Sequence, residues 1–439
     1  MMKGRIRDYT QTILIALLTL SLLALVLAIW LLETPVEWDS AGPAAVAARL
    51  LRLVTPPPET IIVPRGLQYG EAARPVCVVW TEGGRHWAAQ LDTALTDSAF
   101  DRLKGRFSEA MGSAGPPARQ VRSAWLEALS SDSLYLEYAS AQPLRAVALW
   151  LSSENAALPD VSVRRLALVS TDGAVTFWFV DERDGAPYMC RTSTPARDFP
   201  GAHQPGALPC RFGFEDAAFQ RAPLCLLFDQ TPAPSEAVCE PVSLSPPTPE
   251  VDAFLKALHI NPDTNARFPD EEGTTYLGDR RSCRFSRDGS VHYVNPDASD
   301  KPLSPLSAAP QTAEAIEQAR ELLAALSPLP GQARFSLNSA EPSEDGASVT
   351  VTFVYELSGL TVRLADGMPP AVLVFRNGQL ASADVRVLSF SLGGQPTEPL
   401  LSAQIAYLAL AATHPYGDIE LRLYYSECDG VLTPGWENY

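Results

Sequence analysis

The stretch SVTVTFVYELSGLTVRL, residues 348–364, decides the fold class of this chain. Its apolar side chains recur at every second position: Val349, Val351, Phe353 and Tyr355, then Leu360, Val362 and Leu364. A period of two residues places one set of side chains on a buried sheet face and the other set toward solvent. The stretch therefore predicts two β-strands, and Asn377-Gly378 further on predicts a type I′ hairpin turn.

The C-terminal half of the chain repeats an amphipathic helix followed by antiparallel strands. The apolar positions of these helices recur at helical spacing: Val251, Phe254, Leu255 and Leu258; Ile316, Ala319, Leu323 and Leu326; Ile405, Leu408 and Ala412. We place Glu314 and Glu317 in the first turn of the second helix, where the helix dipole favours acidic side chains. Residues 274–294 add strands around an Asp288-Gly289 turn. Residues 251–439 are thus predicted to form one or more C-terminal α+β modules.

The preceding part of the chain also mixes strands and helices. We expect a strand at residues 74–80, a helix after it and a half-buried strand through Leu134, Leu136 and Tyr138. Two strands around Thr171-Asp172-Gly173 complete an α+β domain over residues 61–183. Residues 184–250 contain twelve prolines. We interpret them as a Pro-rich connecting region, with a domain boundary at its end.

Residues 13–32 read ILIALLTLSLLALVLAIWLL, with ten Leu, three Ile and no charge. At about 1.5 Å per residue such a helix spans the hydrocarbon core of a bilayer. Lys3, Arg5 and Arg7 precede it, and acidic residues follow. Because positive charge favours the cytoplasmic side, we predict a cytoplasmic tail at residues 1–12, a single-pass cell-membrane helix at 13–32 and a stalk or linker at 33–60, with the bulk extracytoplasmic.

A cleaved signal peptide is the alternative interpretation of this segment. Its apolar core would span 7 to 15 residues, with a small-residue cleavage site close behind. Here the apolar core is longer, and Glu33-Thr34-Pro35 is a poor cleavage context. These two features favour an uncleaved signal-anchor.

The composition narrows the possible partners. A formal charge of −17 argues against nucleic acid and anionic lipid surfaces, which would repel the chain. Seven cysteines lie far apart, without a C-x-x-C pair. One or two disulfides could form outside the cytoplasm, within the group Cys190, Cys210, Cys225 and Cys239. Burial of the cysteines as small apolar side chains is the equal alternative.

No signature of a common hydrolase, zinc protease or nucleotide-binding protein occurs in the sequence. The five histidines are too far apart for a local metal-binding pair. We therefore predict no catalytic residue, metal ligand or cofactor, and a protein that is not an enzyme. The one candidate contact surface is on the membrane helix, where Ser21, Ala24 and Ala28 share a face that a second helix could approach closely. Chance placement of small residues among many leucines is the alternative.

Together these parts form a recognisable layout. A short basic N-terminus and one span precede an α+β domain containing WLEALSSDSLYLEYASAQPLRAVALWL (residues 125–151), and helix-plus-sheet units end in LRLYYSECDGVLTPGW (residues 421–436). This layout resembles the YycH/YycI family, and residues 251–439 resemble a YycI-like module. The resemblance rests on the order of the elements, without a sharp motif.

The resemblance implies a function for the chain. Proteins of this family regulate the YycG (WalK) sensor histidine kinase of the YycFG/WalRK two-component system in Gram-positive bacteria, which controls cell-wall homeostasis. It implies contact with the kinase, and with a second YycH/YycI-like protein, through transmembrane helices. A cell-surface module that binds a ligand or the cell wall, or an anchored hydrolase, is the alternative that the large outer body suggests.

Overall fold

The computed structural model describes residues 72–438, apart from residues 198, 230–233, 246, 264, 279, 300–307, 394–399 and 415. Residues 67–439 form one compact unit. The predicted tail, membrane helix and stalk, with Ser21, Ala24 and Ala28, lie outside the described residues. None of the helices in the described part is both long and apolar enough to cross a membrane.

Nine strands form the first sheet of the described part. They are β1 (Cys77–Glu82), β2 (Arg85–Gln90), β3 (Ala118–Arg119), β4 (Ser133–Pro143), β5 (Ser162–Thr171), β6 (Ala174–Asp181), β7 (Ala186–Pro195), β8 (Leu208–Phe212) and β9 (Leu226–Phe228). Their order is β3-β7-β6-β5-β4-β1-β2-β8-β9, and all neighbours are antiparallel. The predicted hairpin turn is confirmed, since Asp172 and Gly173 join β5 to β6 with positive φ angles of 51° and 82°.

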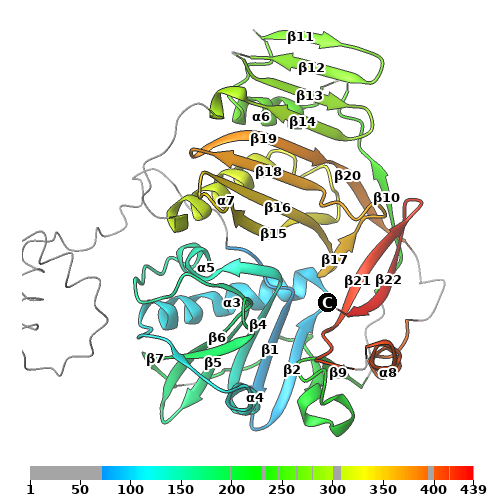
Figure 1. Cartoon of the computed structure of the whole chain (residues 1–439). Coiled ribbons are helices and arrows are strands. Elements are labelled where there is room, and N and C mark those ends of the chain that lie inside the picture. The colour runs from blue at the N-terminus through cyan, green and yellow to red at the C-terminus, as the bar shows by residue number, and fades with distance from the viewer. Residues whose placement is uncertain are drawn as a thin grey trace, which may run out of the picture. The chain divides into compact units, whose positions relative to one another are not determined.

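Helices cover both faces of this sheet (Figure 1). α3 (Thr93–Gly112) and α5 (Leu144–Trp150) pack on one face, and α4 (Arg122–Ser130) packs on the other. Leu134, Leu136 and Tyr138 of β4 are buried under α3 and α5, and Tyr135 is buried beneath α4. The prediction of a half-buried strand was therefore wrong, because α4 covers the face that the alternation assigned to solvent.

Thirteen strands form the second sheet of the described part. They are β10 (Ala237–Pro241), β11 (Ala266–Pro269), β12 (Gly273–Leu277), β13 (Ser282–Ser286), β14 (Ser290–Val294), β15 (Ala333–Pro342), β16 (Ser348–Leu357), β17 (Leu360–Arg363), β18 (Ala371–Arg376), β19 (Gln379–Arg386), β20 (Leu388–Leu392), β21 (Leu421–Cys428) and β22 (Val431–Asn438). Their order is β11-β12-β13-β14-β19-β18-β16-β17-β21-β22-β10-β20, and β15 pairs with β16. The β17–β21 pair is parallel and the other pairs are antiparallel.

The opening stretch of the sequence forms β16 and β17, and the Asn377-Gly378 turn joins β18 to β19, so these predictions are confirmed. All three predicted helices exist: α6 (Pro249–Ala257), α7 (Ala308–Ala324) and α8 (Ala403–Thr413). The described part also contains three short 3-10 helices: η1 (Gly213–Glu215), η2 (Ala217–Phe219) and η3 (Pro296–Ser299). An α+β fold class is thus confirmed for the described part.

Two details of the helices were predicted wrongly. α7 begins at Ala308, so Glu314 and Glu317 lie beyond its first turn, and Glu317 is buried. In α8 the side chains of Ile405 and Leu408 are 54% and 59% exposed, because Ala403, Ala406 and Tyr407 form the packed face. Helical spacing located α8 correctly. Because apolar residues lie on several sides of this helix, their spacing did not identify the buried face.

Residues 184–250 carry more regular structure than a connecting region implies. They contain β7, β8 and β9 of the first sheet and β10 of the second. In Figure 1 this segment runs from the green strands of the lower sheet toward the upper one. The domain boundaries predicted from the sequence stay a prediction, while the segment itself helps to build both sheets.

All seven cysteines lie in the described part, and all are free thiols. Six are buried, and Cys428 is exposed at the turn between β21 and β22. The disulfides considered for Cys190, Cys210, Cys225 and Cys239 are therefore not formed. The alternative interpretation, in which cysteines serve as small apolar core residues, describes the six buried ones.

Candidate functional site

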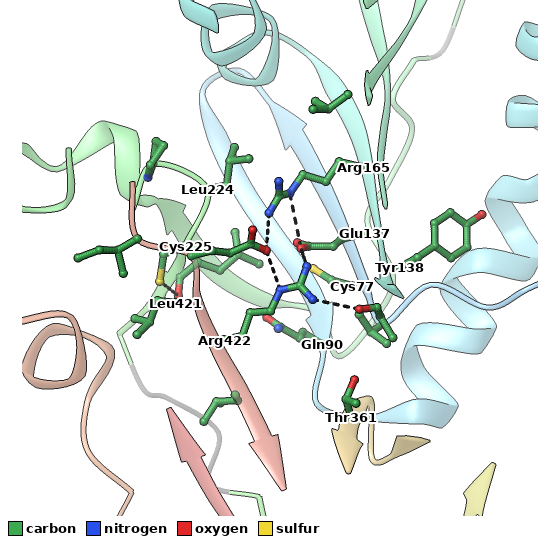
Figure 2. Close-up of a pocket in the computed structure, with 18 of the residues that line it drawn as sticks. Cys77, Gln90, Glu137, Tyr138, Arg165, Leu224, Cys225, Thr361, Leu421 and Arg422 are labelled. Carbon is green, nitrogen blue, oxygen red and sulfur yellow. Dashed lines mark hydrogen bonds and ion pairs between the residues drawn. The ribbon is translucent and has the colours of Figure 1, made fainter. Parts of the chain in front are cut away.

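A cavity of about 340 Å³ lies where the first sheet meets the second (Figure 2). Strands β1, β4 and β5 of the first sheet and β17 and β21 of the second contribute to its wall. Leu224, Cys225 and Leu226 form part of its apolar lining, whereas Glu137, Arg165, Glu182, Glu420 and Arg422 supply charge. Small-molecule sites in proteins have this composition, a mostly apolar wall with a few convergent polar groups.

The pairing of β4 with β5 in the first sheet brings one carboxylate and one guanidinium of the cavity together. Glu137 on β4 lies directly opposite Arg165 on β5. On its other side β5 pairs with β6, and there it bulges: Arg164 and Arg165 together oppose the single residue Val180. A bulge interrupts the alternation of side chains between the two sheet faces. Consecutive arginines, which would point to opposite faces in a regular strand, both reach the same carboxylates here.

The second pair comes from the other sheet. Glu420 precedes β21, Arg422 lies on it, and their i, i+2 spacing places both side chains on one face. Ile419 and Leu421 belong to the apolar cluster beneath α8 and also contribute to the cavity wall. The Glu420 backbone N–H donates to Asn438 Oδ1 at 2.9 Å, which holds the start of β21 against β22.

Ion pairs connect Glu137 and Arg165 of the first sheet with Glu420 and Arg422 of the second, as the dashed lines in Figure 2 show. Arg165 Nη2 donates to Glu420 Oε1 at 2.7 Å, and Arg422 Nη2 lies 3.2 Å from Glu137 Oε1. Arg422 Nε is 2.7 Å from Glu420 Oε1. Arg164, with a side chain 1% exposed, pairs with both carboxylates. Tyr135 donates its hydroxyl proton to the remaining oxygen of Glu137 at 2.9 Å.

Burial governs the acid–base properties of this cluster. It raises the pKa of Glu420 to about 7, and the neighbouring Glu137 and Glu182 add to the shift while Arg165 opposes it. Burial likewise raises the pKa of Glu182. For Arg165, burial favours the neutral form, but the carboxylates of Glu137 and Glu420 outweigh it and the pKa is raised. The Arg165 guanidinium therefore stays charged, whereas Glu420 and Glu182 hold their protons to a higher pH than usual.

We expect the stability of the protein to fall as the pH rises from about 5 to about 8. The Glu420 carboxyl titrates near 7 when folded and near about 4.3 when unfolded, so between these values the folded state holds more protons. Raising the pH then favours the unfolded state. Urea denaturation across this range measures the effect, and Glu420→Gln should flatten the slope. An unchanged slope in that variant would remove Glu420 as the responsible group.

Two thiols in the cavity wall are poor nucleophiles. Burial raises the pKa of Cys225 to about 12, with a further contribution from Glu137. Burial also raises the pKa of Cys77 well above its usual value. Because the thiolate is the reactive form, both sulfur atoms are unreactive at neutral pH. Among the described residues, no group of three His, Cys, Asp or Glu side chains is arranged to hold a metal ion.

The sequence did not identify this cluster as a site. Its signals were present: Arg164-Arg165 is an adjacent charged pair inside an apolar strand, and Glu420 and Arg422 alternate with Ile419 and Leu421. Neither signal reveals that the two strands meet. The predicted contact face, Ser21, Ala24 and Ala28, lies outside the described residues and stays a prediction. Of the tryptophans, Trp150 and Trp178 are buried in the core, whereas Trp436 lines the cavity.

The fold and the site define an α+β protein with a charged cavity between two large, mainly antiparallel sheets. No known family and no curated protein sequence matches the chain. Among solved structures it is similar to YycH from Bacillus subtilis, with 13% identity over 84% of this chain and 94% of that chain and a TM-score of 0.48. An uncharacterized protein from Eubacterium rectale is similar at 15% identity over 46% of this chain and 76% of that chain, with a TM-score of 0.29. Membership of the YycH/YycI family stays a prediction.

Proposed function

We propose that this chain is a membrane-anchored, extracytoplasmic regulator of a sensor histidine kinase of the WalK (YycG) type and acts without catalysis of its own. Its N-terminus lies in the cytoplasm, and its transmembrane helix contacts the kinase and a second YycH/YycI-like protein. Two features of the sequence support this proposal: the single apolar span with its charge bias, and the order of elements that resembles the YycH/YycI family.

The observation that carries the proposal is the cavity that joins the two sheets. Its charged residues come from both sheets, so any change in the cluster alters the contact between them. A regulator needs an element whose arrangement responds to a local event and reaches a distant surface. An ion-pair cluster at the junction of two sheets meets the first of these needs.

The chemistry of the site supports binding over bond-breaking. The carboxylates of Glu137 and Glu420 are each held by three guanidinium groups. A general base needs a lone pair that is free to accept a proton from the substrate. Since these ion pairs hold the Oε1 atoms of Glu137 and Glu420, and the two thiols are protonated, these groups are better arranged to position a ligand than to attack it.

Co-purification tests the proposed partner. The full chain, tagged at its C-terminus, is expected to retain a co-expressed WalK-type kinase after extraction in a mild detergent. An unrelated single-span protein with the same tag serves as the control. Retention of equal amounts of kinase by both proteins would contradict the proposal.

The small-residue face of the anchor gives a sharper prediction. Replacing Ser21, Ala24 and Ala28 by Leu should weaken association with the kinase by about tenfold, because bulky side chains keep two helices apart in the bilayer. Changing Leu20, Leu23 and Leu27 to Ile is the matched control and should leave association unchanged. Unaltered kinase retention by the Leu variant would remove this face from the contact.

One observation favours a second function, an anchored hydrolase. A carboxyl whose pKa burial raises to about 7, beside the second carboxyl Glu137, is the combination that general acid catalysis uses. Incubation of the purified chain with cell-wall fragments separates the two functions. Intact fragments support the regulator, whereas a hydrolytic product that disappears with Glu420→Gln would establish the enzyme.

A further inference from the structure

We infer that the cavity between the two sheets binds a small zwitterion, an amino acid or a short peptide with free ends, with its carboxylate on Arg165 and its ammonium group on Glu182. The inference deepens the proposed function and rests on it only for the role of the ligand as a signal. A zwitterion needs one cationic and one anionic side chain within the same small cavity, and Arg165 and Glu182 both line this one.

The negative contact is Glu182, at the end of β6. Its Oε1 atom is buried and has no hydrogen-bond partner among the described residues. A buried polar atom without a hydrogen-bond partner is unfavourable, so a ligand that supplies a donor to Glu182 gains a hydrogen bond that the protein alone does not form. The acidic side chain is close enough to Arg165 for their charges to interact, and it lines the cavity. An ammonium group satisfies both the hydrogen-bonding capacity and the charge of this carboxylate.

The positive contact is Arg165, whose side chain is 12% exposed. One terminal nitrogen donates to Glu420, and Nε lies 3.6 Å from Glu137. These ion pairs use Nη2 and Nε of Arg165, and its Nη1 atom takes part in none of them. Each guanidinium nitrogen carries its own N–H donors, so Nη1 can donate to a ligand carboxylate while Nη2 and Nε keep their protein partners.

Charge balance selects a zwitterion over an ion. With Glu182 and Glu420 ionised, three guanidinium groups, from Arg164, Arg165 and Arg422, face three carboxylates, from Glu137, Glu420 and Glu182, and Arg122 in the cavity wall pairs with Asp418. A net anion or cation would leave one uncompensated charge in a partly buried site, which is unfavourable. A ligand with one charge of each sign leaves the balance unchanged.

The rest of the wall sets the character of the ligand. Leu224, Cys225 and Leu226 offer apolar surface beside the charged groups, and Trp436 adds an aromatic face. The volume of about 340 Å³ falls at the lower end of the range for small-molecule sites. The site is therefore suited to an apolar amino acid or a dipeptide.

Binding to the purified full chain tests the inference, without any kinase present. The probes are L-leucine, L-leucyl-L-leucine, the same dipeptide with both ends blocked, and decanoate as an apolar anion. Isothermal titration should detect the free dipeptide or leucine, and neither the blocked peptide nor decanoate. Binding of decanoate alone, equal binding of the blocked peptide, or no binding by any probe would overturn the inference.

Two variants locate the ligand. Glu182→Gln keeps the side-chain shape and removes the charge, and it should weaken dipeptide binding at least about tenfold. The exposed Glu341→Gln is its matched control and should bind normally. Leu224→Trp, which fills the cavity, should abolish binding and provides a second test if Glu182→Gln does not fold. Normal dipeptide binding by either cavity variant would place the ligand elsewhere. Since these titrations contain no kinase, their failure is distinct from a failure of co-purification.

Discussion

Replacing Glu137 by Ala is expected to lower the free energy of unfolding by about 3–5 kcal/mol, the usual cost of removing one partner from a buried ion pair. Glu137 pairs with Arg164, Arg165 and Arg422, and its side chain is 18% exposed. Without it the three guanidinium groups lose one of the two carboxylates that each of them pairs with, and Glu420 remains. The two sheets then meet across a concentration of positive charge.

Urea denaturation of the purified chain measures this loss. The matched control is Asp184→Ala, which removes one partner of the exposed ion pair between Arg119 and Asp184, 3.1 Å apart. An exposed pair contributes about 0–1 kcal/mol, so this variant should lie close to the parent protein. Equal losses in the two variants would show that the Glu137 cluster does not hold the sheets together.

Trp150→Ala should cost a similar amount, about 3–5 kcal/mol, because a large buried aromatic side chain leaves a cavity. Trp150 lies at the end of α5, and its Nε1 donates to Glu317 of α7. The guanidinium of Arg320, which is 3.0 Å from Glu317, lies 4.8 Å from the ring centre. This contact connects the helix layer of the first sheet to that of the second.

A second substitution separates packing from the hydrogen bond. Trp150→Phe keeps most of the aromatic volume and leaves the buried Glu317 without its indole donor, so a smaller loss of about 1–3 kcal/mol is expected. Thermal or urea unfolding of both variants provides the comparison. A loss in Trp150→Ala no larger than that in Trp150→Phe would contradict a role for packing at this contact.

Local patterns predicted much of the fold. The alternation in residues 348–364 identified β16 and β17, and the Asp-Gly and Asn-Gly turns identified hairpins, because these features depend on residues close in the chain. Helical spacing located α6, α7 and α8 for the same reason. Whether a face is covered depends on distant elements, and so the burial of β4 beneath α4 and the exposure of Ile405 were missed.

The site could not be predicted, because it depends on register and on long-range contact. A bulge at Arg164 and Arg165 turns both side chains toward Glu137, and a bulge leaves no reliable mark in a sequence. The pairing of Arg165 with Glu420 joins residues 255 positions apart. Alternation showed that Glu420 and Arg422 share a face, but only the packing of the two sheets shows what that face meets.

The central proposal, regulation of a WalK-type kinase, is tested most directly by kinase autophosphorylation in lipid vesicles. The kinase is reconstituted alone and together with an equal amount of the full chain, and incorporation of phosphate is followed over time. The chain is expected to change the rate by about fivefold or more, the range of ordinary allosteric coupling. An identical rate with and without the chain in the same vesicles would contradict the proposed function.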